Sequence, residues 1–543
     1  MIQCGWWRGA VIYQIYPRSF YDSNNDGIGD LPGVYAQLDY IANLGVDAVW
    51  LSPFFKSPMK DYGYDISNYR QVDPVFGDVE DVKKIIEKAH SLGLKVLMDM
   101  VLCHTSDQHA WFKQSRSNKC NDKADWYIWV DPNDDGTPPN NWLSIFGGSA
   151  WEWDSHREQY YLHHFLNSQP SLNFHNSAVR KQMLDETEFW LKLGIDGFRF
   201  DAINFCFHDG LLTCNPAKTK EKRRGRGFST DNPYAYQYHY YDNTRPENIA
   251  FIEDLRELLN QYPGAISLGE IAAEDSIETM AEYTHSNNRL HLAYNFELLT
   301  DECNATYLHQ VINQVNQKIT GGWPCWAIGN HDVVRVRNRW GGDKGSLAQA
   351  KLYHTLLLSL KGSACLYQGD ELALPQADIE YVDLCDPYGI RFWPRFKGRD
   401  GCRTPMPWNE QLNCGFSQAK PWLPVAKGHS ALAVSHQLQD DDSMLNFCKH
   451  LLSWRKNSEV MRLGEMKDLQ VEGELLSFIR FDEQVCILCI FNLSDKPVDY
   501  KLAKNYALVE ENCFALGLYL QKGQQIKLSP YSALLVEIVA TAG

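Results

Sequence analysis

A short pattern recurs in the first 201 residues: a segment with helical spacing ends at Leu-Gly, and an apolar strand follows almost at once. A glycine suits the left-handed residue that ends many helices, and helices that alternate with short apolar strands are typical of a parallel sheet covered by helices. The helix before the second repeat also shows its period, with apolar residues on one face and Asp78 as a cap. The repeats are Leu44-Gly45 before 47–51, Leu92-Gly93 before 95–99, and Leu193-Gly194 before 196–201.

Further apolar segments raise the number of candidate strands to eight, which predicts a closed (β/α)8 barrel of the TIM type. The candidates are 11–15, 47–51, 95–101, 197–201, 265–269, 292–296, 324–329 and 363–367. In such barrels the chemistry lies at the carboxyl ends of the strands. Here those ends carry Asp99, His104, Arg199, Asp201, Glu270, His331 and Asp332.

Two segments do not fit the barrel pattern. More than seventy residues separate the third strand from the next helix, which is too long for an ordinary connection and predicts an inserted subdomain rich in tryptophan. From about residue 459 the pattern changes to short alternating strands, which predicts a C-terminal antiparallel β-sandwich. The expected division is therefore barrel 1–104, inserted subdomain 105–170, barrel 171–458 and C-terminal domain 459–543.

Charge and hydropathy narrow the class of partner. A formal net charge of −16 would repel nucleic acid and anionic membranes, so neither is expected as a partner and a neutral ligand fits better. No stretch approaches the roughly 20 apolar residues of a membrane span, and the N-terminus lacks a signal-peptide pattern. The 15 cysteines are scattered, and those in apolar runs, such as Cys103, Cys365 and Cys489, are expected as reduced core thiols. These features predict a cytoplasmic protein.

The polar residues at the strand ends suggest a reaction. Residues two apart on a strand face the same side, so Arg199 and Asp201 should both point to the barrel mouth, where the guanidinium would lower the pKa of Asp201. Alone, the pair would more readily be interpreted as a structural ion pair. Glu270 ends the next strand and should lie across the same mouth, and two opposed carboxylates about 5–5.5 Å apart are the arrangement for retaining glycoside cleavage. Asp332 adds a third acid, which suits a cation-like transition state.

The chain resembles the α-amylase family of retaining glycoside hydrolases, and within it the bacterial α-glucosidases, over nearly its full length. The resemblance rests on an ordered set of motifs, namely Gln14-Ile-Tyr-Pro-Arg-Ser-Phe20, Asp61-Tyr-Gly-Tyr-Asp65, Asp99 to His104, Gly197-Phe-Arg-Phe-Asp201, Gly269-Glu270, Asn330-His-Asp332 and Arg403-Thr-Pro-Met-Pro-Trp408. It implies Asp201 as nucleophile, Glu270 as acid/base, and Asp332 as the residue that holds and distorts the sugar. Arg199, His104, His331 and Tyr64 would surround the glucosyl ring.

The resemblance also implies which end of the pocket is closed. Residues matching Asp61 and Arg403 bind the terminal 4-hydroxyl in the family's α-glucosidases, so exo action is expected. The aromatic residues Phe146, Phe165, Phe205 and Phe296 are candidate pocket walls, although ordinary core packing explains buried phenylalanines equally well.

A loop near the N-terminus has oxygen donors around a glycine, but Gly33 stands where an EF-hand places its bidentate glutamate, so it is not an EF-hand. Related α-glucosidases bind a structural Ca²⁺ or Mg²⁺ at this loop, which implies a metal here; a metal-free loop of Asx-turns is the alternative. No organic cofactor is expected. The implied ligands are Asp22, Asn24, Asp26, the carbonyl of Ile28, and Asp30.

Together these features predict an exo-acting retaining α-glucosidase that removes terminal α-1,4-linked glucose from small α-glucosides such as maltose, with accompanying transglucosylation, as a monomer or homodimer. Ala202, after the nucleophile, favours α-1,4 over α-1,6 cleavage by analogy with relatives, and is expected to face away from Asp201. The basic segment 208–232 is either a solvated face or a contact for the acceptor. Alternatives are a sucrose hydrolase, an oligo-1,6-glucosidase, a trehalose-forming isomerase, or a non-catalytic sugar-binding relative.

Overall fold

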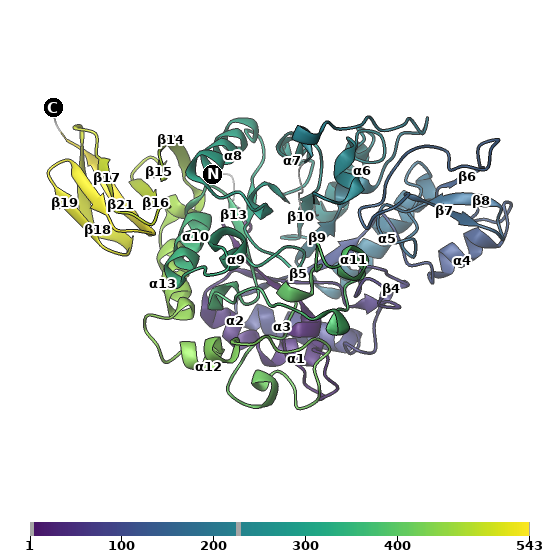
Figure 1. Ribbon diagram of the computed structural model, residues 1–543, viewed down its shortest axis with the longest axis horizontal. Helices are drawn as coiled ribbons and strands as arrows, with labels where there is room; N and C mark the ends of the chain where they lie inside the picture. Colours follow the sequence, from purple (N-terminus) through teal and green to yellow (C-terminus); the bar gives the residue numbers. More distant parts are fainter. Residues whose placement is uncertain (1–4, 224–229, 542–543) are drawn as a thin grey trace.

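The computed structural model describes residues 5–223 and 230–541, and its centre is a barrel of eight parallel strands (Figure 1). Neighbours in the sheet follow chain order, and a parallel bridge between Ala293 and Pro324 joins the two outer strands of the eight, so the sheet closes. The predicted barrel and its strand positions are confirmed to within about two residues. The strands are β1 Val11–Ile15, β2 Ala48–Leu51, β5 Lys95–Val101, β9 Gly197–Asp201, β10 Ile266–Ile271, β11 Leu292–Asn295, β12 Cys325–Ala327 and β13 Ser363–Tyr367.

Helices cover the outside of the barrel, and the Leu-Gly repeats end three segments as predicted: Gly45, Gly93 and Gly194 all have positive φ. Asp78 caps α3 in a reciprocal pair with Asp81. The longer helices are α3 Val79–Ser91, α5 Ser177–Leu193, α6 Asn248–Asn260, α7 Ser276–Thr284, α8 Ala305–Lys318, α10 Leu347–Ser359 and α13 Met444–Lys456. The shorter ones are α1 Leu31–Ala36, α2 Leu38–Leu44, α4 Ala110–Ser117, α9 Val336–Gly341, α11 Pro387–Phe392, α12 Val434–Gln437 and α14 Glu459–Leu463.

The interior of the barrel changes from apolar to polar along the strands. Trp50, Leu97 and Leu268 belong to the apolar cluster that fills it, while the residues two positions further along β5 and β10 are the buried acids Asp99 and Glu270. Side chains two apart on a strand share a face, so these acids lie above the apolar filling, toward the carboxyl ends. The fold therefore brings charged groups together at one end of a dry core.

Two insertions rise near that end. The hairpin β3 Phe55–Lys56 and β4 Asn68–Val72 follows the second barrel strand, and the segment after β5 forms a small antiparallel sheet of β6 Trp129–Val130, β8 Gln159–Leu162 and β7 Trp151–Asp154. Figure 1 shows this sheet and α4 at the right-hand end of the molecule. Among the described residues, none of the helices combines the length and the apolar character needed to cross a bilayer.

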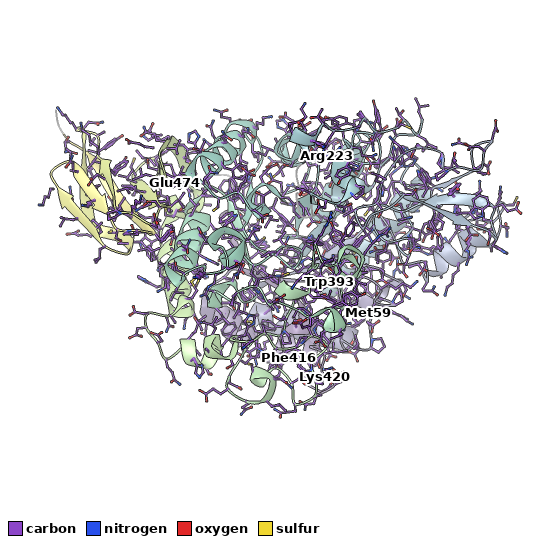
Figure 2. All side chains as sticks on the ribbon, in the orientation of Figure 1. Met59, Arg223, Trp393, Phe416, Lys420 and Glu474 are labelled. Carbon is purple, nitrogen blue, oxygen red and sulfur yellow. The ribbon has the colours of Figure 1, made fainter. Side chains whose placement is uncertain are left out.

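A C-terminal antiparallel domain lies at the opposite end of the molecule (Figure 1). Its apolar core includes Leu488, Ile526 and Leu534, from both of its sheets. Glu474, labelled in Figure 2, accepts a 3.2 Å hydrogen bond from the backbone N–H of Ala305, which ties the domain to α8. One sheet has β14 Glu465–Glu472, β15 Leu475–Phe481, β16 Cys486–Asn492, β18 Tyr506–Leu516 and β21 Ser532–Ala540, and the other β17 Val498–Lys501, β19 Tyr519–Lys522 and β20 Gln525–Leu528.

The cysteines expected in the core behave as predicted. Cys103, Cys365 and Cys489 are buried and carry free thiols.

Candidate active site

A pocket opens at the carboxyl ends of the barrel strands. Most of the predicted site residues line it, including the three acids assigned to catalysis. Three predicted residues, Arg199, His331 and Arg403, do not line it and lie completely buried against those that do. The predicted residues on the wall are Asp61, Tyr64, His104, Phe146, Phe165, Asp201, Phe205, Glu270, Phe296 and Asp332.

Arg199 lies at the centre of the acids. Its Nη1 is 2.6 Å from Asp201 Oδ1 and 2.8 Å from Asp99 Oδ1, and its Nη2 is 2.5 Å from Glu270 Oε1. Parallel pairing places Asp99 directly beside Arg199 on the neighbouring strand, and the guanidinium carbon lies 4.8 Å above the ring of Trp50. A planar guanidinium with fixed donors can hold three carboxylates in one arrangement, which a lysine cannot do.

Of the two central acids, Glu270 has the pKa that its predicted role requires, and Asp201 does not. Burial and the nearby Asp201 and Asp332 raise the pKa of Glu270 to about 7, as a general acid requires. Burial, with Asp99 and Asp332, also raises the pKa of Asp201 to about 7, and Arg199 lowers it only in part. The expectation that Arg199 alone would keep the pKa of Asp201 low is wrong, because burial outweighs the effect of Arg199 and the nearby Asp99 and Asp332 raise the pKa further. The two groups therefore titrate as a pair near neutral pH.

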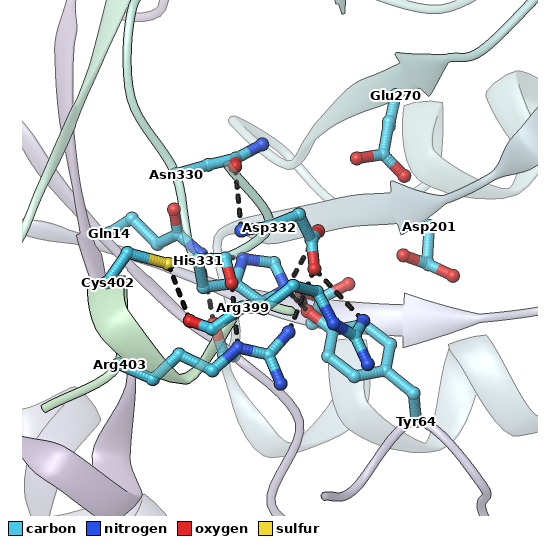
Figure 3. Close-up of polar contacts among 12 residues, drawn as sticks. Gln14, Tyr64, Asp201, Glu270, Asn330, His331, Asp332, Arg399, Cys402 and Arg403 are labelled. Atoms are coloured by element: carbon cyan, nitrogen blue, oxygen red, sulfur yellow. Dashed lines mark hydrogen bonds and ion pairs between the residues drawn. The ribbon is translucent and has the colours of Figure 1, made fainter. Parts of the chain in front are cut away.

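The third acid, Asp332, lies at the other side of the pocket among cations (Figure 3). Its Oδ1 is 2.9 Å from Arg403 Nη2 and 3.2 Å from Arg399 Nη1. Burial raises its pKa, but the guanidiniums of Arg399 and Arg403 outweigh burial and hold the pKa well below its usual value. Asp332 is therefore an anion with fixed orientation, with 21% of its side chain exposed to the pocket.

Arg399 closes this end of the pocket, and the sequence analysis did not identify it. It lines the wall and donates at 2.7 Å to Asp61 and at 2.8 Å to Asp386. Arg403, which was predicted to meet the substrate, instead donates to Asp332 and at 2.7 Å to the carbonyl of His331. Arg399 was missed because it precedes the matched Arg403 motif by four residues, in a segment without regular periodicity.

Tyr64 and His331 form a stacked pair beneath the pocket. Their rings are parallel within 5°, with centroids 5.3 Å apart, and the Tyr64 hydroxyl is 2.5 Å from His331 Nε2. The hydroxyl also donates to Asp99 at 3.1 Å, which connects this pair to the Arg199 cluster. Burial lowers the pKa of His331 well below its usual value, so the ring is neutral.

The four predicted aromatic residues all lie on the pocket wall. Phe165 contacts Phe205 at a centroid distance of 5.5 Å and His104 at 5.1 Å. Phe146 lies under the guanidinium of Arg399, 5.1 Å from its carbon. These contacts also make the rings part of the core, so the rings are both pocket walls and core aromatics.

Ala202 departs from the strand geometry assumed for it. Its φ of 41° is left-handed, which ends the strand's alternation, and it lines the pocket together with Asp201. The prediction that it faces away from Asp201 is therefore wrong. Its N–H donates to Glu270 Oε2 at 3.2 Å, so the turn after Asp201 also orients Glu270.

The basic segment 208–232 contributes to the pocket only in part. Lys218 and Lys222 line the wall, as do Tyr234 and His239 further along the chain. Arg223, labelled in Figure 2, places its guanidinium carbon 4.0 Å from the ring of Tyr236. Arg224 and Arg226 lie outside the described residues.

The predicted metal loop is held by its own backbone. Asp22 accepts from the N–H groups of Asn24 at 3.1 Å and Gly27 at 2.8 Å, and Asp26 accepts from that of Ile28 at 2.8 Å. Asp30 caps α1 by accepting from Gly33 at 2.6 Å. The contacts from Asn24 and Ile28 are those of Asx-turns, as in the metal-free alternative. No group of three metal-binding acids, histidines or cysteines occurs within 5–223 and 230–541.

Comparisons with known proteins agree with this site. Residues 14–464 match the family model "Alpha amylase, catalytic domain". A Rhizobium meliloti (strain 1021) protein named "Probable alpha-glucosidase" is 51% identical over 92% of this chain and 91% of its own length. An oligo-1,6-glucosidase of Heyndrickxia coagulans is 36% identical over 97% of this chain and 98% of its own.

Among solved structures, the α-glucosyl transfer enzyme XgtA superposes with a TM-score of 0.96 at 55% identity, covering 98% of this chain and all of its own. These matches extend over far more than half of the chain. The chain belongs to the α-amylase family of retaining glycoside hydrolases.

Proposed function

We propose that the protein is an exo-acting retaining α-glucosidase that removes terminal α-1,4-linked glucose from small α-glucosides such as maltose. The observation that carries this proposal is that the buried Arg199 binds both Asp201 and Glu270. The ion pair between Asp61 and Arg399 occupies the far end of the same pocket. Family membership supplies the reaction type, and the pocket supplies the substrate size.

In the proposed mechanism Asp201 attacks the anomeric carbon and forms a covalent glucosyl-enzyme. Glu270 donates its proton to the leaving oxygen in this step and removes a proton from water in the next. The raised pKa of Glu270 supports the first role. The positive charge of Arg199 stabilises the state in which one of the two acids is ionised and the other is protonated.

The closed end supports exo action. Asp61 is 3% exposed and held by Arg399, so a hydroxyl of the terminal sugar would find an acceptor and a donor there, and this buried ion pair would stand in the way of a further sugar. Asp332, fixed by two arginines, is placed to accept from the remaining hydroxyls. In this proposal Arg403 acts through Asp332, and Arg399 takes the direct contact that the family pattern suggested for Arg403.

A second candidate is transfer of the same glucosyl group to a sugar or alcohol instead of water. The similarity to an α-glucosyl transfer enzyme favours it, since the two chains share 55% of their residues. Because one relative is an oligo-1,6-glucosidase, isomaltose is an alternative substrate for this protein. Sucrose hydrolysis and trehalose formation need the same glucosyl-enzyme and differ only in the leaving group or in the acceptor of the glucosyl group.

One time course distinguishes these candidates. The purified protein is incubated separately with maltose, isomaltose, sucrose, trehalose and amylose, and the products are resolved by chromatography. The proposal expects glucose from maltose, slower cleavage of isomaltose, and negligible internal cleavage of amylose. Rapid shortening of amylose would show an open cleft, and trisaccharides as the main early product would establish transfer instead.

We also propose the division 1–104, 105–170, 171–458 and 459–543 as domains, a cytoplasmic location, and a monomer or homodimer. The absence of a membrane-crossing helix among the described residues is consistent with that location. Structural Ca²⁺ or Mg²⁺ at 22–30 remains a proposal that rests on the family resemblance. Light scattering measures the oligomeric state, and cell fractionation the location.

A further inference from the structure

A second polar pair lies on the pocket wall, apart from the acids and their arginines. Lys218 Nζ is 2.6 Å from Glu274 Oε1, and their side chains are 8% and 18% exposed. Both residues line the pocket, with Tyr234 and His239 beside them. An ion pair held this far from solvent and open to a ligand cavity is a candidate for binding.

The backbone fixes the position of Lys218. Its N–H donates to the carbonyl of Tyr236 at 2.7 Å, the N–H of Tyr238 donates to Pro216 at 2.8 Å, and Ala217 pairs with Gln237 in an antiparallel bridge. The ammonium lies 5.2 Å from the ring of Tyr238. Lys218 is therefore part of a short ladder and not a freely moving surface lysine.

The position of Glu274 indicates which part of a substrate the pair would meet. Glu274 follows Glu270 by four residues, in the short connection between β10 and α7. Since Glu270 protonates the leaving oxygen in the proposed mechanism, residues next along its loop face the leaving group. The terminal glucose is bound at the opposite end, where Asp61, Arg399 and Asp332 gather.

We propose that Lys218 and Glu274 bind hydroxyl groups of a sugar on the leaving-group side, and of a sugar acceptor in transfer. This inference rests on the proposed function. A carboxylate accepts from a hydroxyl while an ammonium donates to its neighbour, so the pair matches two adjacent sugar hydroxyls. Because the two charges compensate, the pair suits a neutral sugar better than an anion, and an aromatic leaving group without hydroxyls cannot use it.

The experiment compares two substrates that share the glucose and differ in the leaving group. kcat/KM is measured for maltose and for p-nitrophenyl α-glucoside with wild type, Lys218→Met and Glu274→Gln. Lys220→Met is the control, since Lys220 is an exposed lysine of the same segment and does not line the pocket. α-Glucose 1-phosphate serves as a third substrate, with an anionic leaving group.

We expect each pocket variant to lower the ratio of kcat/KM for maltose to that for the nitrophenyl glucoside by about tenfold or more, the usual effect of losing a hydrogen bond to a charged group. The control should keep the wild-type ratio. An unchanged ratio in both pocket variants, including equal losses on both substrates, would overturn the inference. So would a loss confined to α-glucose 1-phosphate, which would assign an anion site. Wild type without activity on either glucoside would instead contradict the proposed function.

Discussion

Arg199 donates from Nη1 to Oδ1 of Asp201 at 2.6 Å, and both side chains come from the same face of one barrel strand. The same guanidinium reaches Glu270 and Asp99, so its shape matters as well as its charge. Replacement by lysine keeps the charge but not the fixed fork of donors. Arg199→Lys should therefore lower kcat/KM on p-nitrophenyl α-glucoside by about a hundredfold or more, the range seen when one preorganised donor is removed.

The matched control for this substitution is Arg480→Lys, because Arg480 is also fully buried but binds backbone carbonyls, from the start of the C-terminal domain and from the end of α10. Circular dichroism checks the fold of both variants. A loss below about threefold for Arg199→Lys would show that charge alone is sufficient.

The pH dependence should reflect the two acids as a pair. The pKa values of Asp201 and Glu270 are both raised to about 7, and only the form with one shared proton is active. Below the lower value Asp201 also takes a proton and the nucleophile is lost; above the upper value Glu270 loses its proton and the general acid is lost. A plot of kcat/KM for maltose should be bell-shaped with its maximum near neutral pH.

The variant Glu270→Gln tests which limb belongs to which acid. On p-nitrophenyl α-glucoside, whose leaving group needs little protonation, the alkaline limb should disappear and the acid limb should remain. A profile that is flat for wild type between about pH 5 and 9 would refute the shared-proton description.

Linkage preference is expected to depend on Ala202, which lines the pocket with a φ of 41°. A β-branched residue is strained in this conformation and adds bulk beside the leaving group. Ala202→Val should therefore shift kcat/KM from maltose toward isomaltose by about tenfold and lower the melting temperature. Ala202→Gly removes the methyl group without strain and should keep the wild-type preference. An unmoved ratio in the valine variant would exclude Ala202 as a determinant.

Metal removal tests the loop 22–30. If the loop binds Ca²⁺ or Mg²⁺, EDTA should lower the melting temperature, the added ion should restore it, and Asp22→Asn should abolish this response. Asp134→Asn, at an exposed acid elsewhere, should leave the response intact. A melting temperature that EDTA does not change would assign the loop to its observed Asx-turns.

Regular patterns in the sequence were sufficient to predict the barrel and the positions of Asp201 and Glu270 in it. The Leu-Gly endings located the helices because a left-handed residue there requires glycine, and the strand period placed Arg199 and Asp201 on one face. Glu270 followed from the same reasoning on the next strand.

The rest depended on contacts that no local pattern reports. Arg399 and Lys218 come from irregular segments, and only the folded chain brings them to Asp61 and Glu274. The pKa of Asp201 could not be predicted from Arg199 alone, because the net shift depends on burial and on other acids around the same cation.

The roles of Asp201 and Glu270 are tested most directly by the configuration of a product formed in azide. Asp201→Ala and Glu270→Ala are each incubated with p-nitrophenyl α-glucoside and sodium azide, and the glucosyl azide is analysed by proton NMR. Without its nucleophile, Asp201→Ala should give the β-azide, because azide attacks from the vacated face. Glu270→Ala should give the α-azide, because azide then attacks the covalent intermediate from the opposite face. An α-azide from Asp201→Ala would contradict the assignment of Asp201 as nucleophile.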